Sequence, residues 1–392
     1  MRNCLLLLLL GLPATLLGQP PRFSDSARIY VLTEAPGAEV YSQWGHSAFR
    51  LHDPARGLDV VFNYGTFSFS TDYFVLKFAR GQLDYLLSVE PYARWLAGAR
   101  QQNRTVTAQA LNVSPTQLNA LAEALVTNAQ PENRAYRYDF FYDNCATRIK
   151  TIVEQALGDS VRFDDRWAAP VTFRHTLGPY LADNPWLRLG IHLGLGAGAD
   201  RTATAHEQTY LPDSLAKAYA TAEVCRGGTW VPLAGPATTV APGQPMPPAL
   251  PDYPLMVALG VLALALGASY RQLRGRSQSR PTVFDRVLFT LVGFAGVFLL
   301  LLWLATEHRV TPNNWNILWA FAPHGCWVWL PARIRRRRAW ASYGYLAAGL
   351  ALCVGVLGLL GVQYFPPTAY VLALAEGVRA LALARYLHPV HA

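Results

Sequence analysis

Five apolar segments in the last third of this chain constrain its fold more than any other feature. An α-helix needs about 20 apolar residues to cross a bilayer, with a usable range of about 17–25. The second and fourth segments fit this range, whereas the third is short and contains Pro323 and His324. The five segments are Tyr253–Tyr270, Val287–Thr306, Trp315–Leu330, Ser342–Val362 and Thr368–Leu387. We therefore predict that residues 253–392 form an all-α membrane domain of about five transmembrane helices.

The net charge of +9 is concentrated in two loops of that domain. Ten arginines and one acid, Asp285, account for it, so the rest of the chain is close to neutral. Because both clusters flank apolar segments, they fit the positive-inside pattern rather than a phosphate-binding surface, and we expect no nucleic-acid partner. The arginines are Arg271, Arg274, Arg276, Arg280, Arg286, Arg333, Arg335, Arg336, Arg337 and Arg338.

The N-terminus has the features of a secretory signal peptide. Arg2 precedes the apolar run Leu5–Leu10 and a small-residue stretch that ends at Gly18. We predict a signal peptide at residues 1–18, which places the following domain outside the cytoplasm. Five spans then put both arginine loops in the cytoplasm. The chain is predicted to be a multi-pass protein of the inner (cytoplasmic) membrane with its N-terminal domain in the periplasm.

The exported part, residues 19–231, is long enough for one domain with its own core. Residues 232–252 are rich in proline and are predicted to be a semi-extended linker that isolates this domain. Mixed strand and helix signals indicate an α+β domain with an antiparallel sheet and a packed helix. The expected elements are strands at His46–Leu51 and Leu58–Asn63 and helices at Pro115–Val126, after Ser114, and at Cys145–Leu157, before Gly158.

Cys145 is the candidate nucleophile. It opens a helix whose apolar residues, Ile149, Ile152 and Val153, recur at helical spacing and should pack on the sheet. The positive end of the helix dipole lowers the pKa of a thiol in the first turn. The free backbone N–H groups of the same turn are ready donors for an oxyanion.

His46 is the candidate base, and Asn63 is the candidate that orients it. If Leu51 pairs with Leu58 in the predicted hairpin, His46 lies opposite Asn63. Directly opposed residues point to the same face of a sheet, so the amide could hold the imidazole ring. A register shift by one residue would separate them.

Other interpretations remain open for these residues. His46 could be structural, and Cys145 could pack in the core or form a disulfide with Cys225, the only other cysteine of the exported part. Zinc is disfavoured because His46 and His52 lie about 20 Å apart along one strand and no second cysteine is near Cys145. We expect no metal and no other cofactor.

Further candidates for substrate contacts lie beside these motifs and at the outer membrane face. Surface salt bridges explain the loop residues equally well, and interfacial anchoring explains the membrane residues slightly better. Two charges in the last span, Glu376 and Arg379, lie on one helical face and are costly in a membrane unless something uses them, so that lipid handling is one interpretation. The contact candidates are Trp44, Tyr64, Asn144, Arg174, His175, His308 and Asn314.

Several segments of the chain resemble a known family. WGHSAFRLHDP, DVVFNYGTFSF and YDFFYDNCATRI are similar to the periplasmic domain of the Lnb-type lipoprotein N-acyltransferases of Bacteroidota. PWLRLGIHLGLGAGADR and TEHRVTPNNWNILW also resemble that family, so that the resemblance covers nearly the whole mature chain. It implies a permuted NlpC-type, papain-like fold in which the histidine precedes the cysteine, as His46 precedes Cys145.

The resemblance also implies a function. Such an enzyme would move an acyl chain from a phospholipid through a cysteine thioester on Cys145 to the α-amine of the diacylglyceryl-cysteine that begins a lipoprotein, with His46 shuttling protons. The phospholipid donor and the diacylated lipoprotein acceptor would be its partners. Two alternatives stay open, namely a papain-like peptidase or amidase of the cell wall, and a non-catalytic membrane-anchored envelope module.

Overall fold

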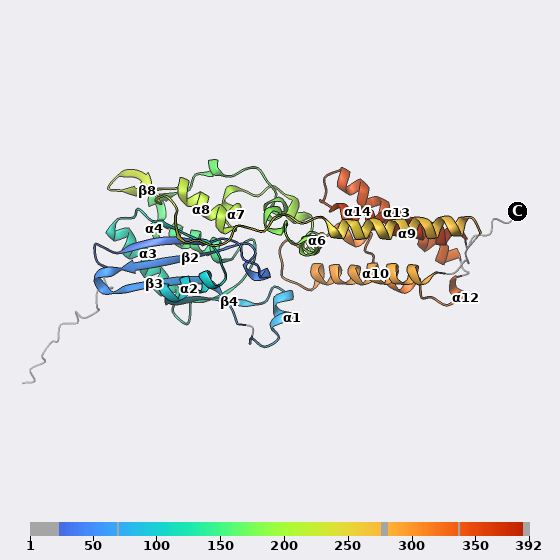
Figure 1. Ribbon diagram of the computed structural model, residues 1–392, viewed down its shortest axis with the longest axis horizontal. Helices are drawn as coiled ribbons and strands as arrows, with labels where there is room; N and C mark the ends of the chain where they lie inside the picture. The colour runs from blue at the N-terminus through green and yellow to red at the C-terminus, as the bar shows by residue number, and fades with distance from the viewer. Residues whose placement is uncertain (1–22, 69, 276–280, 336–337, 387–392) are drawn as a thin grey trace, which may run out of the picture.

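The chain forms an N-terminal α+β domain followed by a helical domain, which confirms the predicted fold class. The structure, a computed structural model, describes residues 23–68, 70–275, 281–335 and 338–386. The predicted signal peptide at residues 1–18 and four of the ten clustered arginines lie outside these residues. The two domains lie end to end along the long axis of the molecule (Figure 1).

An antiparallel sheet is the centre of the N-terminal domain. In the described part of the chain it has seven strands in the order β10-β5-β1-β2-β3-β4-β6, and three short strands form a second sheet in the order β7-β8-β9. The strands are β1 (Arg28–Glu34), β2 (His46–Asp53), β3 (Leu58–Thr66), β4 (Asp84–Pro91), β5 (Val106–Ala110), β6 (Ala135–Arg137), β7 (Val161–Arg162), β8 (Glu223–Arg226), β9 (Thr229–Pro232) and β10 (Thr238–Ala241).

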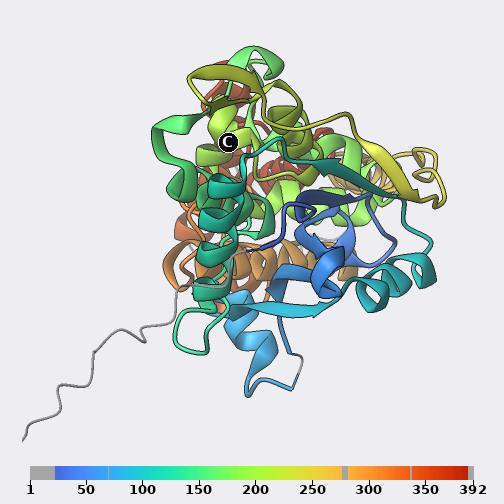
Figure 2. The ribbon, with the colours of Figure 1, turned by 90° about the vertical axis from the view of Figure 1, so that its left-hand side faces the viewer.

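Helices cover both faces of the large sheet. The helices of this domain are α1 (Phe74–Ala79), α2 (Tyr92–Gln101), α3 (Pro115–Asn128), α4 (Cys145–Leu157), α5 (Phe173–Leu177), α6 (Pro185–Gly194), α7 (Ala205–Gln208) and α8 (Pro212–Thr221). Alternation along β2 explains the layers, because Phe49 and Leu51 pack with α3, α4 and α8 whereas Ala48 packs with α2. Helix α1 projects from the rest of the domain (Figure 2).

Local sequence signals predicted the two central helices well. Ser114 caps α3 in a capping box with Gln117, and the helix runs two residues beyond the predicted Val126. Helix α4 begins at Cys145 after the cap Asn144 and ends at Leu157 before Gly158, as predicted. Caps and apolar periodicity are properties of neighbouring residues, so they are readable without the fold.

The predicted register of the β2–β3 hairpin is wrong by two residues. Leu51 pairs with Val60, and Asp53, not Leu51, pairs with Leu58. The strands extend further into the predicted turn, which tightens to a 3-10 turn at Pro54–Arg56 followed by Gly57 with φ of 63°. A shift of two residues moves every side chain along the strand but leaves it on the same face.

The proline-rich segment 232–252 is not a free spacer. Its residues Thr238–Ala241 form β10, the edge strand that pairs with β5. Further along, the Leu250 amide donates to the Ala182 carbonyl at 2.9 Å. The segment therefore belongs to the exported domain over much of its length, and a domain ending at residue 231 lacks one strand of the sheet.

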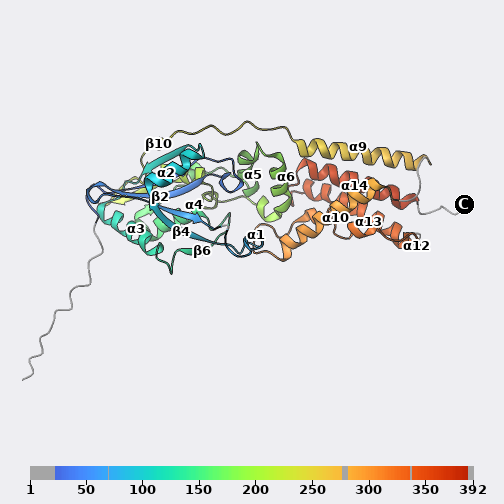
Figure 3. The same cartoon turned by 60° about the horizontal axis from the view of Figure 1, so that its bottom comes forward.

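Among the described residues, four helices are long and apolar enough to cross a membrane (Figure 3). The helices of this domain are α9 (Tyr253–Leu273), α10 (Val283–Leu304), α11 (His324–Trp327), α12 (Ala332–Arg335), α13 (Arg338–Leu359) and α14 (Pro367–Tyr386). The prediction of a helix at Trp315–Leu330 is wrong, because this stretch contains only the 3-10 turn η7 (Trp315–Leu318) and the one-turn helix α11. Pro323 and His324 interrupt it, as its sequence hinted.

The segment Trp315–Leu330 nevertheless runs the length of α10 in the opposite direction. Trp315 meets Trp303 near one end of α10, and Trp329 donates to Thr290 Oγ1 at 2.9 Å near the other. Between them, a Cβ on Gly293 or Gly296 would collide with the backbone of this segment. The segment thus packs along α10, and irregular backbone of this kind is tolerated at membrane depth where it is buried in protein.

The two domains are joined by backbone hydrogen bonds as well as by the chain. Gly196 donates to the Val310 carbonyl at 2.8 Å, and Glu307 donates to the Arg80 carbonyl at 2.9 Å. The Asn314 amide nitrogen donates to the Leu193 carbonyl at 2.6 Å. The loop between α10 and η7 therefore holds the exported domain against the membrane domain, and the predicted isolation of that domain by its linker is wrong.

Candidate functional site

Cys145 lies at the first position of α4, where its surroundings favour the thiolate. The side chain of Asn144 caps the helix by accepting from the amides of Ala146 and Thr147 at 2.9 and 3.0 Å. Burial alone would raise the pKa of the Cys145 thiol. The neighbouring His46 and the amides of Ser47 and Ala146, which donate to the sulfur, outweigh burial and lower that pKa.

His46, the first residue of β2, is the partner of the thiol. Its Nε2 donates to Asn63 Oδ1 at 2.6 Å, because an amide oxygen only accepts. Nδ1 is therefore the ring nitrogen left for the hydrogen bond to Cys145. Burial lowers the pKa of His46, but the negative charge of Cys145, the nearby carboxylate of Glu34 and the bond to Asn63 together raise it to about 9. Thiolate and imidazolium thus stabilise each other.

Gly65 makes room for this pair. The register of β3 against β4 shifts between Tyr64 and Thr66, and Gly65 within this irregularity has φ of 92°, which disfavours any side chain. A Cβ at Gly65 would lie 3.7 Å from His46 Cε1 and 3.8 Å from Cys145 Cβ. The bulge leaves open space directly beside the reacting groups.

Two tyrosines near the thiol escaped the sequence analysis. The Tyr136 hydroxyl is buried, has no hydrogen-bond partner among the described residues and would lie 4.0 Å from the same Cβ. Tyr138 stacks on Tyr85 with ring centroids 4.1 Å apart. Burial and the charge of Cys145 raise the pKa of Tyr136 and of Tyr138 well above the ordinary value, so both remain protonated donors. The alternation of tyrosines in AYRYD, just before the cysteine motif, was the available signal.

A cavity of about 1110 Å³ opens in front of Cys145. This volume slightly exceeds the range of about 300–1,000 Å³ typical of small-molecule sites. Aromatic and aliphatic side chains dominate its lining, which extends from the thiol to the loop after α10. These apolar lining residues include Trp44, Phe67, Phe74, Phe78, Tyr85, Phe140, Leu187, Ile191 and Leu195.

Three of the predicted contact residues lie at this cavity. Trp44 lines it beside Phe140, with ring centroids 4.8 Å apart, and its buried Nε1 has no partner among the described residues. Asn144 also lines it, but its amide nitrogen donates to the carbonyls of Phe140 and Tyr210, so it holds backbone in place. His308 also lines it, and its Nε2 is 3.1 Å from the Ala79 carbonyl oxygen.

The structure does not bring the other four to the cavity. Tyr64 is buried in the core between sheet and helices, and His175 is exposed on α5. Arg174 is buried and pairs with Asp200 at 2.6 Å while donating to backbone carbonyls. Asn314 is fully buried, and its amide ties the two domains together. The donors of Arg174 and Asn314 are thus occupied within the protein.

Cys145 and Cys225 are both free thiols. Among the residues that the structure describes, no group of three or more His, Cys, Asp or Glu side chains is placed to hold a metal ion. Cys145, His46 and Asn63 thus lie together as a thiol, an imidazole and an amide that holds the ring, an arrangement able to support thiol-dependent transfer or hydrolysis.

Comparison with protein families matches both halves of the chain. The model of the Lnb N-terminal periplasmic domain matches residues 23–178, which include His46, Asn63 and Cys145. The model of the Lnb transmembrane domain matches residues 250–388. No curated protein and no solved structure matches the chain.

Proposed function

The chain belongs to the Lnb family, as a membrane protein with a periplasmic domain, and from this premise we propose that it transfers acyl chains to lipoproteins. Membership of the family supports a role in lipoprotein processing at the membrane. The proposed donor is a phospholipid of the inner membrane. The proposed acceptor is the α-amine of the diacylglyceryl-cysteine at the N-terminus of a lipoprotein, and the nucleophile is Cys145.

One observation carries the proposal, namely the cavity that leads from the thiol to the membrane domain. Cys145 and His46 line it, and so do Phe78, Gly81 and His308, where the exported domain meets the loop that follows α10. An apolar space of this size suits an acyl chain. A peptide substrate would instead need a row of exposed backbone donors and acceptors, so the lining favours a lipid over a cell-wall peptide.

The first half of the reaction would form the thioester. The Cys145 thiolate attacks the ester carbonyl carbon of the phospholipid, a C–S bond forms, and the ester C–O bond breaks. The leaving alkoxide takes the proton that the His46 imidazolium holds, and lysophospholipid departs. Because thiolate and imidazolium already exist as a pair, no separate activation of the thiol is needed.

The second half would return the enzyme to its starting state. The α-amine of the lipoprotein attacks the thioester carbonyl, the N–C bond forms and the C–S bond breaks. Neutral His46 takes the proton from the amine, so that imidazolium and thiolate are regenerated. Asn63 holds the ring in one orientation through both halves by accepting from Nε2.

Two donor groups are suited to the oxyanion of each tetrahedral intermediate. The backbone amides of Ser47 and Ala146 point at the sulfur. The Tyr136 hydroxyl is protonated, buried and without a partner, so it can donate to charge that develops beside Gly65. Donors fixed before the reaction stabilise an oxyanion without a reorganisation cost.

Mass spectrometry of the purified full chain in vesicles of phosphatidylethanolamine tests the first half. We expect Cys145 to gain the mass of one acyl chain in a hydroxylamine-sensitive bond, with release of one lysophospholipid. Addition of a synthetic diacylated lipopeptide should then discharge the acyl chain to its N-terminus. The substitution Cys225→Ser, at the other cysteine of the exported domain, is the matched control and should leave both steps intact. An unmodified Cys145 in protein that cleaves cell-wall peptides would overturn the proposal.

A further inference from the structure

Helix α1 exposes apolar side chains that a water-soluble surface would bury. Tyr73, Val75, Leu76 and Phe78 are 78%, 76%, 56% and 54% exposed, although they are consecutive or nearly so in the chain. Scattered exposed apolar residues are ordinary, but a contiguous group of this kind marks an interaction surface. The exposed face of α1 is defined here by Tyr73, Val75 and Leu76.

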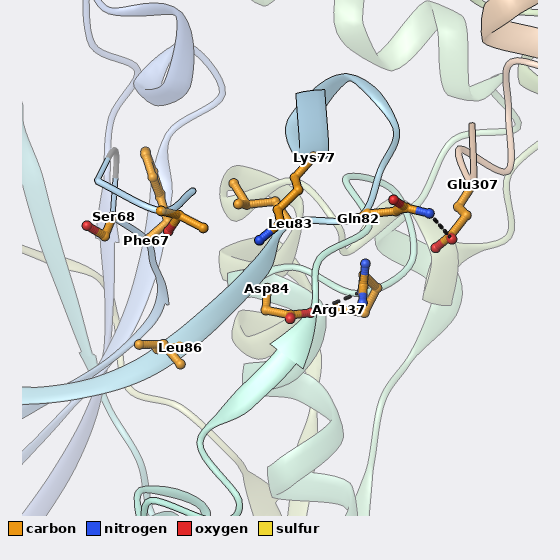
Figure 4. A pocket seen from close by; sticks show the side chains of 10 residues that line it. Phe67, Ser68, Lys77, Gln82, Leu83, Asp84, Leu86, Arg137 and Glu307 are labelled. Atoms are coloured by element: carbon orange, nitrogen blue, oxygen red, sulfur yellow. Dashed lines mark hydrogen bonds and ion pairs between the residues drawn. The ribbon is translucent and has the colours of Figure 1, made fainter. Parts of the chain in front are cut away.

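The position of α1 indicates what covers this face. Its C-terminal turn is bonded to the loop that follows the membrane helix α10, since Glu307 donates to the Arg80 carbonyl and His308 Nε2 lies 3.1 Å from the Ala79 carbonyl oxygen. Figure 4 shows Gln82, just after α1, donating to Glu307, at 2.7 Å. Leu304, the last residue of α10, is 77% exposed as a lipid-facing residue would be.

The opposite side of α1 forms a wall of the reactive cavity. Phe74 stacks on Phe67 with ring centroids 5.8 Å apart, and also on Phe78. Phe67, Phe74 and Phe78 all line the cavity that reaches Cys145. One short helix therefore has the cavity on one side and an uncovered apolar face on the other, at the level where a membrane helix ends.

We propose that the exposed face of α1 inserts into the outer leaflet of the bilayer that holds α10, and that acyl chains pass beside α1 into the cavity. Lys77 and Arg80 flank the apolar residues, and cations at this depth suit the phosphates of lipid headgroups. Lys77 faces a second, smaller cavity of about 510 Å³ lined also by Gln82 and Glu307 (Figure 4). The insertion follows from the position of α1 alone, whereas the passage of acyl chains rests on the proposed function.

Fluorescence quenching tests the insertion without any assumption about activity. A bimane label is placed at Leu76→Cys in the full chain, with the other cysteines replaced by alanine, in vesicles of phosphatidylethanolamine and phosphatidylglycerol. The matched control is Val126→Cys, which is 44% exposed and belongs to α3, a helix on the side of the exported domain away from the helical domain (Figure 3). We expect doxyl-labelled lipid to quench position 76 at least about twofold more than position 126, and aqueous iodide to quench it less.

The outcomes of this test separate the possible occupants. Strong iodide quenching at position 76 would show a water-exposed face and overturn the insertion. Protection from both quenchers would show that a protein, such as a second copy of this chain, covers the face, and would overturn it as well.

Activity tests the passage of acyl chains. Leu76→Asp should lower the acylation of Cys145 by vesicle phospholipid about tenfold, the factor that burial of one leucine is worth. Its reaction with soluble p-nitrophenyl acetate should be unchanged, since Leu76 does not line the cavity. Val126→Asp should change neither. Equal loss with both donors would indicate misfolding, and unchanged acylation by phospholipid would overturn the passage. If the wild-type chain takes no acyl chain from phospholipid, the proposed function fails, whereas the quenching result still stands.

Discussion

The exported site and the core of the membrane domain both bury charged groups, but the two regions differ in how many hydrogen-bond partners their buried polar groups have. At the exported site, the Cys145–His46 pair opens onto a cavity, and the buried Trp44 Nε1 and Tyr136 hydroxyl have no partner among the described residues. In the membrane domain, Arg379 is 1% exposed and its donors reach Asp285 at 2.7 and 2.9 Å, Ser269 at 2.9 Å and Gln272 at 3.2 Å.

The second membrane pair is also buried, but it is less completely satisfied, because Glu376 Oε2 has no hydrogen-bond partner among the described residues. His324 Nε2 lies 2.9 Å from Glu376 Oε1, both side chains are fully buried, and the pair joins α11 to α14. The interpretation of Glu376 and Arg379 as a lipid-handling face therefore does not hold, because both lie inside the bundle with protein partners. The difference teaches that a buried charge with complete partners, such as Arg379, joins helices, whereas the unpartnered Trp44 Nε1 and Tyr136 hydroxyl near Cys145 are donors that a substrate can use.

The largest effect should come from the reacting pair. Cys145→Ser and His46→Ala should each lower acyl transfer at least about 10³-fold, because serine is not ionised near neutral pH and alanine carries no proton. Mass spectrometry of lipoprotein N-termini in cells measures this loss, and membrane insertion should be unchanged. Triacylated lipoproteins at normal level in the Cys145→Ser strain would contradict the role of the thiol.

The membrane charges should matter for stability instead. Arg379→Ala leaves Asp285 buried without its partner and should lower the free energy of unfolding by about 3–5 kcal/mol. Replacing both residues, as Arg379→Met with Asp285→Leu, should recover most of that loss. Thermal unfolding in detergent measures the stability, and reaction with p-nitrophenyl acetate should be unchanged in the folded fraction. An Arg379→Ala protein that is as stable as the wild type, but whose Cys145 no longer reacts with p-nitrophenyl acetate, would contradict this distinction between the two regions.

Tyr136→Phe sharpens the comparison because it removes only a hydroxyl that lacks a partner. We expect kcat for acyl transfer to fall about 10²-fold, the effect of losing one oxyanion donor. The melting temperature should stay equal or rise, since no hydrogen bond is lost. Tyr64→Phe is the matched control, because Tyr64 is buried in the same core and packs against Tyr136 with ring centroids 6.2 Å apart. Equal kinetic effects in both variants would assign Tyr136 to packing.

Asn63→Ala should have a smaller effect than loss of the base itself. A hydrogen bond to a charged ring contributes about 1.5–3 kcal/mol, which corresponds to a fall of about 10- to 100-fold in acyl transfer. The remaining rate should be measurable by accumulation of lysophospholipid. A wild-type rate in Asn63→Ala would show that the 2.6 Å bond to His46 does not orient the ring during reaction.

The smallest expected effect is a shift in the pH dependence of Cys145 alkylation and of phospholipid cleavage. The pKa of Cys145 is lowered and that of His46 is raised to about 9, so the ion pair exists between them. Alkylation of Cys145 by iodoacetamide should therefore begin at lower pH than that of an ordinary cysteine thiol. In His46→Ala, burial raises the thiol pKa and only the amides of Ser47 and Ala146 oppose it, so alkylation should shift to higher pH. Phospholipid cleavage should fall above about pH 9 as the imidazolium loses its proton. Identical alkylation profiles in wild type and His46→Ala would contradict the ion pair.

The contact between His46 and Asn63 shows how far sequence reasoning reached. The predicted register is wrong by two residues, yet the two side chains do meet, because a shift of two keeps both on one face. The correct register depended on how tightly residues 54–57 turn, which the hairpin sequence does not determine alone. Tyr136 was missed for a related reason, since only the pairing of β6 with β4 carries it to the thiol.

By itself, the sequence determined the start of α4 at Cys145, the caps of α3 and α4, the alternation of β2, and the division into exported and membrane parts. Each of these follows from residues a few positions apart, through caps, periodicity and apolar length. Only the tertiary structure decided the path of Trp315–Leu330 along the glycines of α10, the partners of Arg379, and the docking of α1 against residues 307–308. These depend on which surfaces distant in the chain fit closely enough to exclude lipid and water, and that fit is a property of the packed molecule.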